Sequence, residues 1–400
     1  MLICHDTMIR TLENPFYYLE NFHRVTAWIS ERYGDLLNDD EHTFIAGFTA
    51  LPQASQALLV RMVMRKGSLF RASKLCYEEI GCTQEAARPL VEHGWIDNRP
   101  PLTLEQVFGL LTKTEIAKAF RSSLPSTTAR KADQLEALRA QFTDARPFDA
   151  WHPASDDCVY QVRIDALCER LKLMFFGNCR QDWTEFVLSD LGIYRYEQVE
   201  FSASSRGFRR REEVDTYLHL HQCRERFEKG ASPDDILKDI PAAALDNDWL
   251  ESRRAKLLFQ IAQHHERSGA LSNALELYSA CSYPGARLRA IRVMERLERF
   301  EEACALATGA AQRLESEAER QQLLRILPRL HRKLGLPGIA PQPAPSVARI
   351  TLTLPQPETP YAVEMLAAER LAQDDAPVYY VENTLITSLF GLLCWEAIFA

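Results

Sequence analysis

Residues 55–80 have the sequence SQALLVRMVMRKGSLFRASKLCYEEI, and this stretch decides the fold of the region around it. Apolar residues recur every three or four positions from Ser55 to Lys66 and from Arg71 to Ile80, which predicts two helices. Helices are also predicted at 15–33, 40–51 and 83–93, the last with Thr83 as its N-cap and Gly94 at its end. Residues 95–97 are then expected to be extended. Helices followed by a short extended piece are the outline of a winged-helix unit.

The same stretch is basic in a chain that is acidic overall. No Asp or Glu occurs from Gln53 to Tyr77, although the whole chain has a net charge of −8. Arg61 and Arg65 are four residues apart and share a helix face. Such grouping suits the neutralisation of DNA phosphates, but a solvated helix face without a partner is an equal alternative. The candidate DNA contacts here are Arg61, Arg65, Lys66, Arg71 and Lys74.

A second basic segment, SASSRGFRRR, covers residues 202–211. It follows an aromatic-rich stretch at 194–201 that alternates like a strand, so residues 202–207 are expected to form the tip of a small hairpin. Hydroxyls, exposed amides and guanidinium groups together suit phosphate oxygens, whereas a flexible basic loop is the alternative. The candidate contacts are Arg206, Arg209, Arg210 and Arg211.

Scarce glycine and helical periodicity predict a mainly α chain. The remaining predicted helices cover 102–120 (two short helices separated near Thr112), 122–145, 159–191, 212–229 and hairpins over 249–334. In the hairpins, Glu266-Arg267 with Ala274 recurs 29 residues later as Glu295-Arg296 with Ala303, a pattern that resembles tetratricopeptide hairpins. Arg287, Arg289 and Arg292 at a repeat helix are weaker candidate contacts.

The C-terminal segment begins with a proline-rich stretch from Pro337 to Pro360, which predicts an extended linker. Helices are predicted at 361–373 and 384–400. The last one is almost wholly apolar and has no capping glycine or polar tail, so we expect the natural chain to continue.

Composition places the chain among globular proteins of several domains. It has no leader resembling a signal peptide and no apolar stretch that spans a bilayer comfortably, and its ten cysteines form no Cys-x-x-Cys pair, so no membrane association and a cytoplasmic location are predicted. The acidic net charge argues against a protein that coats nucleic acid through the electrostatic attraction of its overall charge.

Motifs for catalysis are weak. PDDILK at 233–238 superficially resembles a metal-nuclease motif but is better explained as the first turn of a helix. His219, His221 and Cys223 match no standard zinc spacing. Glu382, just before the last helix, is one carboxylate without evident partners.

Three stretches resemble the Fanconi-associated nuclease family: NPFYYLENFHRVTAWI at 14–29, residues 55–80, and VENTLITSLFGLLCWEAIF at 381–399. The resemblance implies a winged-helix and SAP-like DNA-binding region over 1–150, with LTLEQVFGLLTKTEIAKAF at 102–120 in the SAP-like part. It further implies a tetratricopeptide-like helical domain, which together with the wing-like hairpin predicted above would occupy 151–336. A linker and the first helices of an α/β nuclease domain would occupy 337–400.

The resemblance also implies an activity and its metal. Family members are structure-selective DNA repair nucleases that act as 5′ flap endonucleases and 5′-to-3′ exonucleases in interstrand crosslink repair, with Mg²⁺ or Mn²⁺. By position, Glu382 matches the family's first metal-binding glutamate, whereas the aspartate and Glu-x-Lys of the motif have no counterpart. The 400-residue chain is therefore expected to lack activity by itself.

The expected partners are branched or 5′-flap DNA, with the arginines near Arg287 as candidates for meeting a 5′ end, and repair proteins. The sequence predicts no oligomeric state. A bacterial origin is expected, with association to the nucleoid during repair. The alternative from another class is a helical-repeat scaffold that binds a protein partner and has no nuclease activity.

Overall fold

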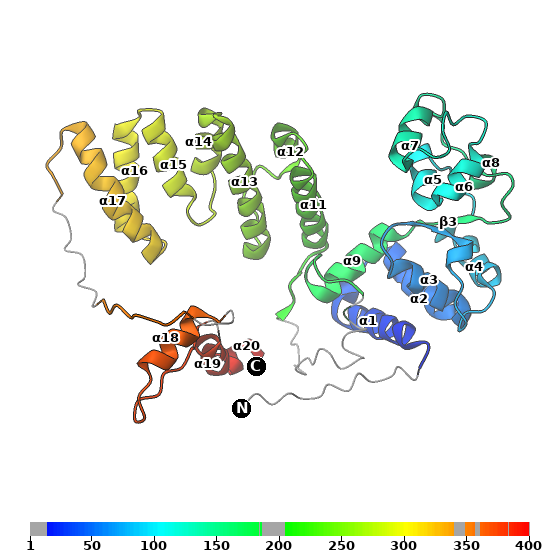
Figure 1. Ribbon diagram of the computed structural model, residues 1–400, viewed down its shortest axis with the longest axis horizontal. Helices are drawn as coiled ribbons and strands as arrows, with labels where there is room; N and C mark the ends of the chain where they lie inside the picture. Colours follow the sequence, from blue (N-terminus) through cyan, green and yellow to red (C-terminus); the bar gives the residue numbers. More distant parts are fainter. Residues whose placement is uncertain are drawn as a thin grey trace. The chain divides into compact units, whose positions relative to one another are not determined.

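The computed structural model describes residues 14–183, 185, 205–339, 349–356, 361–382 and 384–399. The chain is mainly helical, as predicted (Figure 1). It divides into two compact units, the first comprising Met1–Tyr196 with Ala203–Arg254 and the second Glu197–Ser202 with Ala255–Ala400. Each unit has its own buried apolar residues.

The first unit begins with a group of helices around one apolar core. Its elements are α1 (Tyr17–Tyr33), η1 (Gly34–Leu36), α2 (Asp39–Ala50), α3 (Gln53–Val63) and α4 (Thr83–Glu92). These helices match four of the predicted ranges. Phe22, Phe48 and Leu58 are at most 2% exposed in this core. Gly94, at φ +69°, ends the turn after α4 in the left-handed region that glycine tolerates.

A three-stranded antiparallel sheet completes this group, with strand order β1-β3-β2. The strands are β1 (Leu69–Arg71), β2 (Ile96–Asp97) and β3 (Val159–Val162). The helix predicted at 71–80 is wrong, because β1 pairs with β3 and is followed by only a short turn, η2 (Ala72–Lys74). The predicted capping role of Thr83 is also wrong, since its hydroxyl donates to the Leu75 carbonyl oxygen.

A small helical module is inserted between β2 and β3. It contains α5 (Leu104–Leu110), α6 (Lys113–Ala119), α7 (Lys131–Arg139) and α8 (Phe148–Trp151). The predicted break near Thr112 is confirmed, because that residue caps α6 through a capping box with Glu115. The predicted continuous helix over 122–145 is wrong, since only Lys131–Arg139 within it is helical.

The chain leaves β3 through α9 (Asp165–Phe176), which starts later than predicted because Val159–Val162 forms the central strand. The first unit continues with α11 (Arg211–Glu228), α12 (Pro233–Asp239) and the start of α13 (Asp248–Ser268). The strand predicted at 194–201 and the first part of its loop lie outside the described residues.

Helical hairpins form the main part of the second unit. After α13 come α14 (Leu271–Ser279), α15 (Ala286–Arg296), α16 (Phe300–Gln312) and α17 (Glu317–Leu334). Helices α14 to α17 each pack against the next one along the chain, which confirms the predicted hairpins (Figure 1). Ala274 on α14 and Ala303 on α16, the small residues of the 29-residue repeat, are fully buried.

The C-terminal segment contains α18 (Val363–Leu371), α19 (Leu385–Leu393) and α20 (Trp395–Phe399). The predicted final helix is thus interrupted at Cys394. Much of the predicted linker lies outside the described residues. Within the part of the chain that the structure describes, no helix has the length and apolarity needed to cross a bilayer.

Candidate nucleic-acid interface

Three cations from residues 55–80 lie at the turn between α3 and β1 and on η2, which follows β1. The turn passes through Gly67, whose φ of +89° suits a residue without a side chain. Arg65 donates from Nη1 to the carbonyl oxygen of Lys74 over 3.2 Å, so the two ends of the segment lie together. Arg65, Lys66 and Lys74 are all exposed. Their side chains form a basic turn that is open to a ligand.

Arg61 is committed to the protein itself. Its guanidinium pairs with Glu79 over 2.7 Å and lies over the rings of Tyr18 at 3.9 Å and Tyr77 at 4.8 Å. Hydrogen bonds from Arg61 and Tyr18 overcome the effect of burial and lower the pKa of Glu79. This charge links α3 to the turn before α4 and does not face a ligand.

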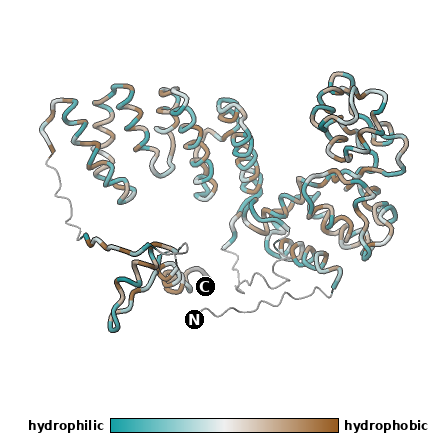
Figure 2. Tube along the Cα trace, viewed as in Figure 1, coloured by the Kyte–Doolittle hydropathy of each residue, from teal (hydrophilic) through white to brown (hydrophobic). Residues whose placement is uncertain are grey.

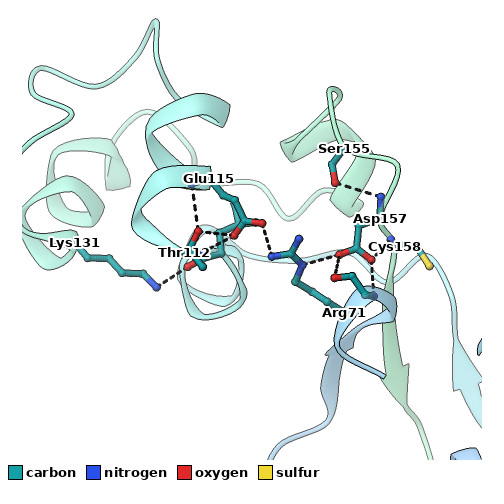
Figure 3. A network of polar contacts seen from close by, with 9 residues as sticks. Arg71, Thr112, Glu115, Lys131, Ser155, Asp157 and Cys158 are labelled. Atoms are coloured by element: carbon teal, nitrogen blue, oxygen red, sulfur yellow. Dashed lines mark hydrogen bonds and ion pairs between the residues drawn. The ribbon is translucent and has the colours of Figure 1, made fainter. Parts of the chain in front are cut away.

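Arg71 is also internal, as Figure 3 shows. Its side chain is 9% exposed, and it pairs through Nε with Asp157 and through Nη1 with Glu115, each over 2.7 Å. Burial opposes the charge, but the two carboxylates raise the pKa of Arg71. Asp157 also accepts hydrogen bonds from the backbone and hydroxyl of Ser73. Arg71 therefore ties together three segments of the fold.

In the second basic segment, too, some arginines pair with carboxylates of the fold and others are exposed. Arg211 pairs over 2.5 Å with Glu41, a fully buried carboxylate that also holds Arg170 over 2.6 Å. Arg206 pairs with Asp35 over 2.8 Å and lies over the Tyr33 ring. These contacts dock the start of α11 against α2 and η1. Arg209 and Arg210 are exposed beyond them.

An open cleft of about 690 Å³ lies beside these two exposed arginines. Its lining includes Gly177 and Trp249 as well as the acidic residues Glu213 and Asp246. Arg210 approaches both carboxylates, at 3.7 Å and 3.6 Å. Since the cations here are partly compensated, the cleft has a mixed rather than a strongly basic character.

The third group of arginines, on α15, makes contacts within the helical hairpins. Arg287 pairs with Glu319, which is 2% exposed, and with Glu315 over 3.1 Å. Arg289 lies 3.5 Å from Glu266, and Arg292 donates to Gln322. These pairs bridge neighbouring helices, so the group presents less available charge than its sequence indicates.

The inserted module contributes exposed cations that the sequence analysis did not select. Lys118 lies on α6, and Arg121 and Arg130 flank the turn that follows it; all three are exposed. Lys113 donates to the carbonyl oxygen of Thr128 over 2.8 Å and holds this turn against the start of α6. The sequence signal was dispersed, because these residues are separated by up to twelve positions.

Of the residues considered for metal binding, Cys223 and His219 contact each other, with 3.7 Å between Sγ and Nε2. Glu382 is exposed and accepts a hydrogen bond from the Tyr380 hydroxyl over 2.9 Å. His219 contacts the carbonyl oxygen of Asp239, and His221 lies 3.5 Å from Glu225. Among the described residues, no group of three or more His, Cys, Asp or Glu side chains is arranged to hold a metal. The PDDILK segment forms α12, as expected for a helix start.

Two family models match adjacent parts of the first unit: the FAN1 HTH domain over residues 16–97 and the Fanconi anemia-associated nuclease SAP domain over 101–151. Together with the fold, these matches define the DNA-binding region of a structure-selective DNA nuclease. A Fanconi-associated nuclease 1 homolog of Pseudomonas aeruginosa is 56% identical over 389 residues, covering 97% of this chain and 70% of that protein. The chain belongs to the Fanconi-associated nuclease family.

More distant relatives are Fanconi-associated nuclease 1 homologs. One from Arabidopsis thaliana is 25% identical and covers 56% of this chain and 27% of its own length. The protein from Mus musculus is also 25% identical and covers 74% of this chain and 32% of its own length. A crystal structure of paFAN1 bound to 2nt 5′ flap DNA with gap matches with a TM-score of 0.90 at 56% identity, over 98% of this chain and 72% of that chain.

Proposed function

We propose that this chain supplies the DNA-binding part of a 5′ flap endonuclease and 5′-to-3′ exonuclease that acts in interstrand crosslink repair. The observation that carries the proposal is the likeness to paFAN1 in complex with 5′ flap DNA, over almost the whole chain. In this role the chain acts on the chromosome of a bacterial cell, as the Pseudomonas relative suggests. Repair proteins are further expected partners.

The exposed cations are the proposed DNA contacts, and two groups of them form the main proposed DNA-binding surfaces of the first unit. The turn cations are Arg65, Lys66 and Lys74, and the module cations are Lys118, Arg121 and Arg130. Lysine and arginine side chains of this kind bind phosphate oxygens and give binding that weakens as salt rises. Arg209 and Arg210 provide a third, weaker contact beside the cleft. Arg61, Arg71, Arg206, Arg211 and Arg287 act in the fold.

Glu382 fits the family's metal site in its chemistry, since a carboxylate oxygen is the ligand that Mg²⁺ and Mn²⁺ prefer. We propose that it is one ligand of a catalytic metal ion and that the remaining ligands come from residues beyond those that the structure describes. When bound, the ion supplies the electrostatic stabilisation that phosphodiester cleavage needs. This chain by itself is then expected not to cleave flap DNA with either ion.

The test replaces Lys66 and Lys74 by Ala and measures binding to fluorescent 5′ flap DNA over a range of salt concentrations. We expect weaker flap binding and a salt slope that falls by about 0.9 for each phosphate that is no longer neutralised. The matched control replaces Lys238 by Ala, an exposed lysine on α12 that pairs with Asp235 over 2.7 Å, and should bind like the unaltered chain.

Equal binding by the control and the double variant would contradict the assignment of the turn cations. An unaltered chain that binds no flap DNA but retains a protein partner would support the scaffold alternative. Cleavage of flap DNA by the unaltered chain with Mn²⁺, abolished by Glu382→Ala, would contradict the proposal that further ligands are required.

A further inference from the structure

The winged-helix group consists of α1 to α4 and the sheet of β1, β2 and β3, and the inserted module consists of α5 to α8. Arg71 lies at the junction between them. Its partner Glu115 is on α6 of the module, while Asp157 lies in the segment that returns from the module to β3. Asp157 is 9% exposed and Glu115 is 26% exposed, so water competes little for either ion pair. One guanidinium thus binds both the module and its return segment to β1.

Glu115 is itself fixed in place. It closes the capping box of α6, accepting from the backbone and hydroxyl of Thr112 over 2.7 Å each. A helix start that is held by its cap presents the second carboxylate oxygen to Arg71 in a set direction (Figure 3). The ion pair therefore constrains the orientation of α6 and not only its distance from β1.

The other contacts across this junction constrain orientation less. Leu69 and Val159 pack against the module's apolar core, but apolar contacts are not directional. Arg99 pairs with Asp149 over 2.9 Å, yet the two side chains are 69% and 59% exposed, where such pairs contribute little. Beside this pair lies a cavity of about 210 Å³, whose lining includes Asn98, Arg99, Phe148 and Asp149. The buried Arg71 network is the directional tie.

We propose that Arg71 is a positioning residue that sets the angle between the winged-helix group and the inserted module, and thereby the preference for branched over continuous DNA. This inference rests on the proposed function, because it needs both surfaces to bind one DNA molecule. The turn cations are on one side of the junction and the module cations on the other. A fixed angle between two phosphate-binding surfaces selects the bend of the DNA that can reach both.

The proposal predicts different effects on two measured quantities, the salt slope of binding and the preference for flap over continuous duplex DNA. Loss of a direct phosphate contact would change both together. Arg71 is buried and doubly paired, so its replacement removes no contact with DNA and should leave the salt slope unchanged. Release of the fixed angle should instead lower affinity for flap DNA relative to continuous duplex. We expect that preference to fall by roughly threefold to twentyfold, as for other residues that couple distant parts of a protein.

The experiment measures dissociation constants for 5′ flap and continuous duplex DNA at several salt concentrations, using the full chain. The variants are Glu115→Gln, Arg71→Ala and Arg71→Lys. Glu115→Gln keeps the capping box, since Gln106 closes the equivalent box of α5. It replaces the charged oxygen that accepts from Arg71 with an amide nitrogen, which cannot accept a hydrogen bond. Arg71→Lys keeps one ion pair and should lose less preference than Arg71→Ala. Lys74→Ala is the control.

The expected result is a reduced flap preference with an unchanged salt slope for Glu115→Gln and Arg71→Ala, against a reduced salt slope for Lys74→Ala. Full flap preference in Glu115→Gln, with a melting temperature that confirms folding, would overturn the proposal. A reduced salt slope in Arg71→Ala would also overturn it, because it would make Arg71 a phosphate contact. Failure of the proposed function differs from both, since the unaltered chain would then show no salt-dependent flap binding.

Discussion

At the scale of single residues, Glu115 carries the clearest electrostatic signature. Hydrogen bonds from Thr112, with a further contribution from Arg71, lower its pKa from 4.5 to about 2. The hydrogen bonds from Ser73 and Arg71 also lower the pKa of Asp157, although burial acts in the opposite direction. Both carboxyl groups therefore stabilise the folded chain in their charged form.

These lowered pKa values predict that acid weakens the junction between the winged-helix group and the inserted module. A carboxyl group with a lowered folded-state pKa stabilises the fold fully above its unfolded-state value and loses that contribution as pH falls through the folded-state value. For Glu115 the loss runs from pH about 4.5 down to about 2. The melting temperature of the chain should exceed that of Glu115→Gln near pH 6, and the difference should shrink across this range.

The matched control is Glu136→Gln, whose side chain is 70% exposed and pairs with Arg139 at the surface. Surface pairs contribute little to stability, so its melting temperature should follow that of the unaltered chain at every pH. A difference for Glu115→Gln that stays constant from pH 6 to pH 2 would show that the carboxylate charge does not stabilise the junction.

The sequence identified where positive charge is concentrated, but not which arginines are available to a ligand. Lys66 and Lys74 follow from local sequence, because no acid lies near them. Arg71 meets a carboxylate 86 positions later, and Arg211 meets Glu41, which is 170 positions earlier. Ion pairs over such separations depend on the tertiary fold, and local charge patterns do not contain them.

At the scale of elements, the repeated alanines of the helical hairpins provide a packing test. Ala303 on α16 is fully buried in a cluster formed by α15, α16 and α17, whereas Ala305 on the same helix is exposed. Ala303→Leu adds volume where the helices pack closely and should destabilise the chain by roughly 1–3 kcal/mol. Ala305→Leu makes the same substitution at an exposed position of the same helix, where Ala and Leu have similar helix propensities, and should change stability little.

Urea unfolding followed by circular dichroism measures both variants. Equal midpoints for Ala303→Leu and Ala305→Leu would mean that the hairpins tolerate a larger side chain at the repeat position, and that the small residue there has no packing role.

Elements with a local signal were predictable, and those that depend on distant pairing were not. The two short helices separated near Thr112 and the hairpins over 249–334 follow from the interruption and the periodicity of the apolar pattern. Strand β1 was not predicted, and its last residue, Arg71, was assigned to a helix, because its partner, β3, lies beyond the whole inserted module. Three residues carry no pattern that separates a strand from a helix turn until that pairing is known.

At the scale of the whole molecule, the family resemblance predicted the order of the modules, whereas the insertion of one module between two strands of a sheet required the structure.

The C-terminal segment presents an unusual apolar surface. On α19, Leu389, Phe390 and Leu393 are 53%, 65% and 85% exposed, and the segment is strongly hydrophobic in Figure 2. Contiguous exposed apolar side chains favour association with other apolar surfaces.

This surface predicts self-association that depends on α19. The double variant Phe390→Lys with Leu393→Lys should bind less of an apolar dye such as ANS and sediment as a smaller species at high protein concentration, because it interrupts the apolar face with charge. The control adds the same charge elsewhere, through Gln312→Lys with Gln321→Lys, at two exposed positions in the helical hairpins. If both variants reduce association equally, net charge and not the apolar face is responsible. If neither changes dye binding or sedimentation, α19 is not the surface through which this chain associates.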